Sequence, residues 1–284
     1  MTALALNPAT GQYIEAGNTP RVGQMTITPD QARAILDIRN THNRNISPTI
    51  VAKYARDMAN GDWLLNGDAI RFAADGTLLD GQHRLAAIIK SGATIRTVVV
   101  WNLPAEAQAT MDDGRKRTMA NVLELSGQRT SAKTVAAILR RAILWERGVV
   151  VSGGASAPTK AEMQQYLNDH PEVTDAAVLA DHIRNTRGVK CAASTLGLAY
   201  YLFSAKSKTA ADEFFDKLRT GAGLEEGNPI LVLRNRLAMD GSTRLATESP
   251  EVLAWFIKAW NAWRKGRTIR ILRFKAGETF PEPK

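Results

Sequence analysis

Apolar residues follow a strand-like pattern at three places in the first half of the chain. Residues 68–72 alternate in part between polar and apolar side chains, and residues 95–101 form an almost continuous apolar, β-branched run. Alternation is typical of a half-buried strand, and a continuous run of this kind is typical of a buried one. The Asp-Gly pair at residues 75–76 is a hairpin turn signal, and a short apolar run follows it at residues 77–79. The pattern therefore predicts three strands.

Helical spacing appears between and around these strands. Ser47 is a favourable N-cap residue, Pro48 suits the first helical position, and Gly61 is a typical stop. These signals predict a helix over residues 48–60. Residues 39–45 are polar and are expected to form a loop. Similar patterns predict helices over residues 30–38, over residues 82–90 and from residue 104 onward.

Beyond about residue 118 the pattern is almost entirely helical, and only residues 269–274 look extended. The predicted fold class is therefore α+β, with a small mixed α/β domain over residues 25–125 and an all-helical domain over residues 126–284. Residues 1–24 show little periodicity and are expected to form a flexible N-terminal arm. The helices predicted in the second half cover residues 131–146, a segment opened by the capping box Thr159 to Glu162, and residues 172–186, 191–205, 208–219, 229–238 and 250–264.

Charge and composition narrow the classes of partner. The 284 residues include 37 Lys and Arg against 28 Asp and Glu, which gives a formal net charge of +9. A surplus of this size favours polyanions, with nucleic acid ahead of a membrane surface. Cys191 is the single cysteine, so an internal disulfide and a multi-cysteine zinc site are excluded, and a buried structural thiol is expected. No membrane-spanning run or signal peptide is recognisable, so a soluble, cytoplasmic protein without a membrane partner is expected.

The segment LLDGQHRLAAI combines features of an anion-binding corner. A strand that ends in Gly81 and leads directly into a helix presents free backbone N–H groups at the positive end of the helix dipole. Arg84 offers a planar fork to phosphate oxygens, and His83 is suited to donate to the same anion or to relay a proton. Asp80 is suited to bind a metal ion or to activate a hydroxyl. In the alternative interpretation, Asp80 caps the helix and Arg84 pairs with a nearby acid.

Residues 46–117 resemble the ParB/sulfiredoxin superfamily, and specifically the DGQHR-bearing ParB-like proteins of phages and mobile elements. Gly81-Gln82-His83-Arg84 is in register with the G-E-R-R phosphate motif of ParB, and its His-Arg pair is similar to that of the free-serine kinases and of sulfiredoxin. The resemblance implies that a nucleoside triphosphate places its phosphates over this helix N-terminus. It also implies a bacterial or phage-infected host cell.

A second motif of ParB, E-N-x-x-R, is similar to residues 113–117, with Gly114 in place of the Asn. In the family this motif supplies a carboxylate for Mg²⁺ and a basic side chain for the phosphates. Taken alone, residues 113–117 are also typical of a solvated turn. In sulfiredoxin the catalytic cysteine lies inside the phosphate motif. Cys191 of this chain is far from that motif in sequence, which argues against a sulfiredoxin activity. The resemblance thus implies phosphate binding by Gly81, Gln82, His83, Arg84, Arg115 and Arg117, catalytic roles for Asp80, His83 and Asp113, and Mg²⁺ binding by Asp80 and Asp113.

The C-terminal region carries a basic segment. Between residues 258 and 275 there are seven Lys and Arg residues and no acid, with aromatic residues interleaved. Such a composition is typical of a nucleic-acid surface. Phe256, Trp260 and Trp263 follow i, i+4, i+7 spacing, which instead favours a core stripe. The residues predicted to contact DNA are Arg264, Lys265, Arg267, Arg270 and Arg273.

Three functions follow from these observations. The first is a ParB-like nucleotide-binding protein that hydrolyses or transfers phosphate with Mg²⁺ in a DNA-linked process. The second is a non-catalytic DNA-binding or adaptor protein on the same fold, and the third is a ParB-like nuclease. A nucleotide and DNA are the expected partners, and association into a homo-oligomer stays open.

Overall fold

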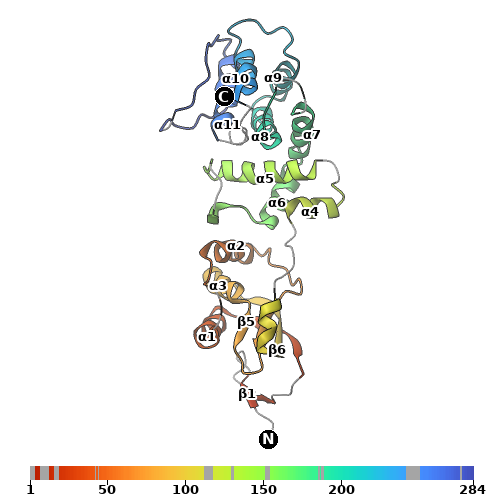
Figure 1. Ribbon diagram of the computed structural model, residues 1–284, viewed down its shortest axis with the longest axis vertical. Coiled ribbons are helices and arrows are strands. Elements are labelled where there is room, and N and C mark those ends of the chain that lie inside the picture. The colour runs from red at the N-terminus through yellow and green to blue at the C-terminus, as the bar shows by residue number, and fades with distance from the viewer. Residues whose placement is uncertain are drawn as a thin grey trace. The chain divides into compact units, whose positions relative to one another are not determined.

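The protein is described here by a computed structural model, and its chain divides into two compact units. One comprises residues 1–116 with 153–161, and the other comprises residues 117–152 with 162–284. Figure 1 shows the strands in the first unit and a set of helices in the second. The structure describes residues 19–41, 43, 45–111, 118–128, 131–150, 154–184, 186, 189–240, 250–275 and 277–284, and the backbone of β1 (Leu4–Leu6) and β2 (Tyr13–Glu15).

A four-stranded sheet forms the centre of the first unit, which we call the α/β unit. Its order is β3 (Arg21–Ile27), β6 (Ile95–Leu103), β4 (Ala69–Ala73) and β5 (Leu78–Asp80). β4 runs parallel to β6, whereas β3 pairs antiparallel with β6 and β5 pairs antiparallel with β4. The three predicted strands are confirmed.

Strand β3 begins inside the segment that was expected to be a flexible arm, so that prediction was wrong from Arg21 onward. β3 pairs with β6 along its whole length, from Arg21 opposite Trp101 to Ile27 opposite Ile95. Most of its side chains are exposed or half-buried, and only Ile27 is buried. An edge strand of this kind needs no apolar alternation, because backbone pairing rather than burial holds it in place.

Three helices pack around this sheet. α1 (Pro29–Arg39) begins with a capping box between Thr28 and Gln31, and α2 (Pro48–Ala59) and α3 (Gln82–Ser91) both contribute apolar faces to one core. The segment after Pro104 forms a short 3₁₀ helix, η1 (Ala105–Thr110). A second short 3₁₀ helix, η2 (Gly154–Ser156), belongs to the same unit. Arg56 of α2 holds η2 by donating to the carbonyl oxygens of Ala155 and Ala157, at 2.7 and 2.8 Å.

The second unit, which we call the helical unit, contains no strand among its described residues. The segment 269–274, expected to be extended, forms no ladder, although the Ile269 N–H donates to the Gly227 carbonyl oxygen at 2.9 Å. Its helices are α4 (Met119–Leu125), α5 (Ala132–Glu146), α6 (Lys160–Asp169), α7 (Val173–Ile183), α8 (Ala193–Ser204), α9 (Lys208–Thr220), α10 (Pro229–Asp240) and α11 (Pro250–Arg264). The first two residues of α6 fall in the α/β unit.

Aromatic side chains of α8, α9 and α11 cluster in the core of the helical unit. Phe203 of α8 stacks on Trp260 of α11 with ring centroids 4.5 Å apart, and both side chains are fully buried. Phe256 is also fully buried, and Trp263 is half-buried against the same cluster. The core interpretation of the aromatic stripe on α11 is therefore confirmed.

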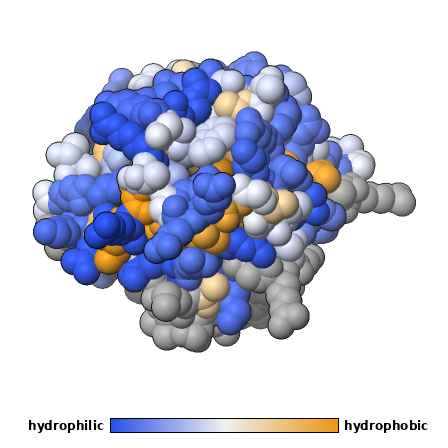
Figure 2. All heavy atoms as spheres, turned by 90° about the horizontal axis from the view of Figure 1, so that it is seen from above, coloured by the Kyte–Doolittle hydropathy of each residue, from blue (hydrophilic) through white to orange (hydrophobic). Residues whose placement is uncertain are grey.

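Hydrophilic residues cover most of the face of the chain that Figure 2 presents, with smaller hydrophobic areas between them. In the part of the chain that the structure describes, no helix combines the length and the apolar character needed to cross a membrane.

Gly197 lies where α8 approaches its neighbours most closely. A Cβ atom at this position would overlap Cδ1 of Ile138 and lie 3.2 Å from the carbonyl oxygen of Ala176. Gly197→Ala should therefore lower the free energy of unfolding by about 1–2 kcal/mol, because overpacking outweighs the better helix propensity of Ala. Chemical denaturation followed by circular dichroism measures this change.

The second variant, Gly197→Ala combined with Ile138→Val, removes the atom that the new methyl group would meet. It should recover part of the lost stability. An unchanged or raised stability of Gly197→Ala alone would show that α5 and α8 are not packed at this distance.

Candidate functional site

The corner between β5 and α3 is built around Gly81. This residue is the N-cap of α3 and has a φ of 112°, a conformation that side chains with a Cβ rarely adopt. A Cβ atom here would lie 3.0 Å from Cγ1 of Ile70 on β4. Gly81 therefore allows Ile70 to pack directly against the backbone. Since the N-cap residue is a glycine, it provides no side-chain cap for the helix.

Two guanidinium groups converge on the carboxylate of Asp80. Arg71 lies opposite Asp80 in the β4–β5 ladder, and its Nη1 is 2.5 Å from Oδ2. Arg84 follows one helical turn later, and its Nη2 is 2.7 Å from the same oxygen. The side chains of Arg71, Asp80 and Arg84 are 31%, 19% and 13% exposed. One half of the alternative interpretation, the pairing of Arg84 with an acid, describes this arrangement, and the acid is Asp80 itself. The other half is wrong, because the N-cap residue of α3 is Gly81 and not Asp80.

One nitrogen of Arg84 is left without an acceptor. Nη1 is buried and makes no hydrogen bond to any residue that the structure describes. A buried donor that makes no hydrogen bond costs about 1–3 kcal/mol, more when it carries charge. Two positive groups against one carboxylate also leave the cluster with a formal charge of +1. The corner therefore combines a net positive charge with a buried donor that makes no hydrogen bond to the described residues.

His83 joins α3 to the start of α2. The backbone N–H of Ser47 donates to Nε2 of His83 at 3.0 Å. Because Nε2 accepts this bond, it carries no proton in this arrangement. Ser47 is the N-cap residue of α2 as predicted, but its side chain makes no capping hydrogen bond. His83 thus fixes how the two helices meet.

Gln82 belongs to a network of amide side chains below the helix N-terminus. Asn40 donates to the Gln82 side-chain oxygen at 3.3 Å, and Asn43 donates to Asn40 at 2.8 Å and to the Leu78 carbonyl oxygen at 2.6 Å. Gln108 donates to Asn43 at 3.0 Å and to the Leu79 carbonyl oxygen at 2.9 Å.

This network holds the carbonyl groups of Leu78 and Leu79 in β5, the strand that ends at Asp80. Arg71, Asn40, Asn43 and Gln108 were not singled out in the sequence. Arg71 could have been found from the hairpin register, but the amides carry no comparable signal.

Asp113, Arg115 and Arg117, the second predicted motif, lie outside the described residues. Among the residues that are described, no group of three or more His, Cys, Asp or Glu side chains could hold a metal ion. The roles predicted for these three residues, and for Asp80 as a ligand of Mg²⁺, therefore stay predictions.

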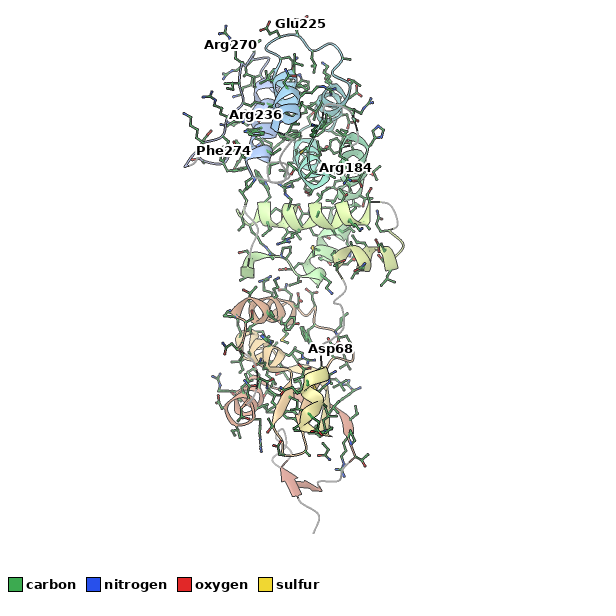
Figure 3. All side chains as sticks on the ribbon, viewed as in Figure 1. Asp68, Arg184, Glu225, Arg236, Arg270 and Phe274 are labelled. Carbon is green, nitrogen blue, oxygen red and sulfur yellow. The ribbon has the colours of Figure 1, made fainter. Side chains whose placement is uncertain are left out.

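The predicted DNA-contacting residues lie in the helical unit: Arg264 is the last residue of α11, and the other four lie on the segment that follows it. Figure 3 shows Arg270 and Phe274 on this segment, at the margin of the unit. The side chains of Arg264, Lys265, Arg267, Arg270 and Arg273 are all exposed.

This segment is anchored at several points although it has no regular structure. Nζ of Lys258 donates to the Arg273 carbonyl oxygen at 2.6 Å, forms an ion pair with Glu278 and lies 5.6 Å from the Phe274 ring centroid. At the end of the chain, Nε1 of Trp260 donates to the Lys284 carbonyl oxygen at 3.0 Å. The exposed Arg and Lys side chains are thus attached to a backbone that these contacts hold in place.

Comparison with known proteins adds no assignment: no family model, no curated protein and no solved structure matches the chain.

The geometry of the corner predicts that Asp80 stabilises the α/β unit. Asp80→Asn replaces the shared carboxylate by a neutral amide and leaves two partly buried guanidinium groups without their counter-charge. The free energy of unfolding should fall by about 1–3 kcal/mol. Urea denaturation measures this change.

Asp62→Asn is the matched control, because Asp62 is exposed in the loop after α2. A surface change of this kind should stay within about 0.5 kcal/mol of the parent protein. Equal effects of the two substitutions would show that the Asp80 cluster does not hold the corner together.

Proposed function

We propose that the α/β unit binds the phosphate groups of a nucleoside triphosphate at the corner between β5 and α3, as in the ParB-like proteins that its DGQHR segment resembles. The observation that carries this proposal is the buried Nη1 of Arg84, which has no acceptor among the described residues. A phosphate oxygen supplies the missing acceptor and neutralises the surplus charge of the cluster. In this proposal Asp80 positions Arg71 and Arg84.

The helix N-terminus adds to the same attraction. α3 has ten residues and begins without a side-chain cap. Its first-turn N–H groups and its dipole favour an anion at this end. Arg71 is 31% exposed, more than Asp80 or Arg84, so it is the member of the cluster that is most accessible to solvent. Both features favour a phosphate over a neutral ligand.

Chemistry on the bound nucleotide forms the second part of the proposal. The resemblance assigns a carboxylate for Mg²⁺ to Asp113 and further phosphate contacts to Arg115 and Arg117. Hydrolysis or transfer of phosphate needs such a carboxylate together with bases that offset the charge of the triphosphate.

Arg84→Ala should weaken nucleotide binding at least tenfold, because a charge-assisted hydrogen bond contributes about 1.5–3 kcal/mol. Isothermal titration calorimetry with ATP, CTP and GTP, each with and without Mg²⁺, measures the affinity. Arg84→Lys should retain part of it, since a point charge replaces the planar fork.

Lys90→Ala is the control for the loss of one positive charge, because Lys90 lies in the last turn of the same helix. A melting temperature recorded for each variant separates lost binding from lost folding. Unchanged affinity of Arg84→Ala for all three nucleotides, or equal losses for Arg84→Ala and Lys90→Ala, would contradict the proposed site.

A second candidate function is DNA binding without turnover of a nucleotide. The arrangement of Asp80 favours it, because two guanidinium groups already occupy one oxygen of that carboxylate and compete with any metal ion. The exposed Arg and Lys side chains of the segment after α11 then contact the phosphates of the DNA backbone. In this case nucleotide binding, if present, causes no release of phosphate.

Replacing Arg267, Arg270 and Arg273 by Ala should weaken DNA binding and flatten its salt dependence. The slope of log K against log[salt] is negative, and each lost phosphate contact reduces its magnitude by about 0.9. Fluorescence anisotropy with a labelled duplex across a salt series measures this slope.

Lys133, Lys190 and Lys206 provide the matched control, because all three are exposed in the helical unit outside the basic segment. Replacing them by Ala removes the same total charge. If both triple variants change the slope equally, the segment after α11 is not a DNA surface.

A further inference from the structure

A row of aligned side chains crosses all four strands of the sheet in the α/β unit. Asp80 of β5 lies opposite Arg71 of β4, which in turn lies opposite Val100 of β6. Val100 lies opposite Val22 of β3. Residues that lie directly opposite each other in a ladder point to the same face of the sheet. The two valines therefore share the face that carries the Asp80 carboxylate.

The core of the α/β unit lies against the opposite face of the sheet. Ile70 of β4 and Val99 of β6 are buried in one cluster with side chains of α1, α2 and α3. Successive residues of a strand point to opposite faces, so Val98 and Val100 lie on the other side of β6. Both are half-buried, and Val22 is 71% exposed. Apolar surface is thus accessible to solvent in the same row as the two guanidinium groups and their carboxylate.

We propose that this row binds the nucleoside part of the nucleotide, with the ribose and the base packed on Val100 and Val22. The inference rests on the proposed function, because it starts from phosphate groups held at Arg84 and Arg71. Neighbouring strands lie about 4.8 Å apart, so the backbone of Val100 lies about 10 Å and that of Val22 about 14 Å from the backbone of Asp80. A nucleoside triphosphate carries its charge at one end and its flat ring at the other, and the row presents cations and apolar side chains in the same order.

The size and the chemistry of this surface favour a nucleoside over a protein partner. β-branched side chains on a pleated strand form a flat apolar surface, which suits a planar ring. Two valines provide a surface for one ring, whereas a stable protein interface buries about 800 Å² on each partner. Gln24 lies opposite Val98 on the same face and is exposed, so its amide offers donors and an acceptor to the edge of a base.

NMR of the full chain with labelled valine methyl groups tests this inference. The chain is titrated with ATP, CTP and GTP, and separately with inorganic triphosphate, which has neither ribose nor base. At least one nucleotide should shift the methyl signals of Val22 and Val100 saturably and give nuclear Overhauser effects between them and its base or ribose protons. Inorganic triphosphate should shift only the side-chain signals of Arg84 and Arg71. Val178, which is 45% exposed in the helical unit, is the matched control and should not respond.

The two probes separate the inference from the proposal on which it rests. Saturable shifts at Arg84 with nucleotides, without nuclear Overhauser effects at Val22 or Val100, would overturn the nucleoside site and leave the phosphate site in place. Equal shifts of the valine methyl groups with inorganic triphosphate and with nucleotides would do the same. No saturable shift at Arg84 with any of the four probes would overturn both.

Substitutions then measure the contribution of the valines. Val22→Thr combined with Val100→Thr should weaken nucleotide binding about fivefold and leave the affinity for inorganic triphosphate unchanged, because each change replaces an apolar methyl group by a hydroxyl. Threonine keeps the β-branched shape that favours a strand, and Val22→Thr alone keeps the test valid if the double variant fails to fold, since Val22 is exposed. Val178→Thr should leave both affinities unchanged. Equal losses for nucleotides and inorganic triphosphate in the double variant would contradict a nucleoside contact.

Discussion

The carboxylate of Asp80 accepts from two guanidinium groups that reach it from different elements, Arg71 from β4 and Arg84 from α3. This shared acceptor connects the β4–β5 hairpin to the helix that follows it. It also holds the two guanidinium groups close together, because its negative charge offsets the repulsion between them. The anion site that we propose depends on this arrangement, because the carboxylate positions both cations and neutralises only one of them.

The contribution of such a cluster to stability is seen when one of its members is removed. A partly buried ion pair contributes little net stability compared with solvated charges, but the loss of one partner leaves the others desolvated. The polar network of Asn40, Asn43 and Gln108 fixes the carbonyl groups of the same strand. Together these contacts make the corner between β5 and α3 stiff, and a stiff corner loses little conformational entropy when a ligand binds.

Much of this architecture could be predicted from local patterns. Residues 95–101 form a strand as their β-branched run predicts, but burial alternates along it: Ile95, Thr97 and Val99 are buried, whereas Val98 and Val100 are only half-buried. The helices of the second half were predicted from their apolar residues. β3 escaped prediction because a mostly exposed edge strand lacks that signal. The corner residues Asp80 to Arg84 are contiguous and were predicted as one group. Arg71 and the amide network are distant in sequence and come together only through the hairpin register and the packing of α1, so no short motif reveals them.

The phosphate site that we propose places an oxygen of the ligand against Arg84 at the N-terminus of α3. The most direct test is an NMR titration of the full chain with a nucleoside triphosphate, following the backbone amides of residues 81–85 and the Arg84 side-chain N–H signals. If a phosphate binds there, the shifts should be saturable and largest at these groups. Shifts confined to other parts of the chain, or no saturable shift with any nucleotide, would contradict it.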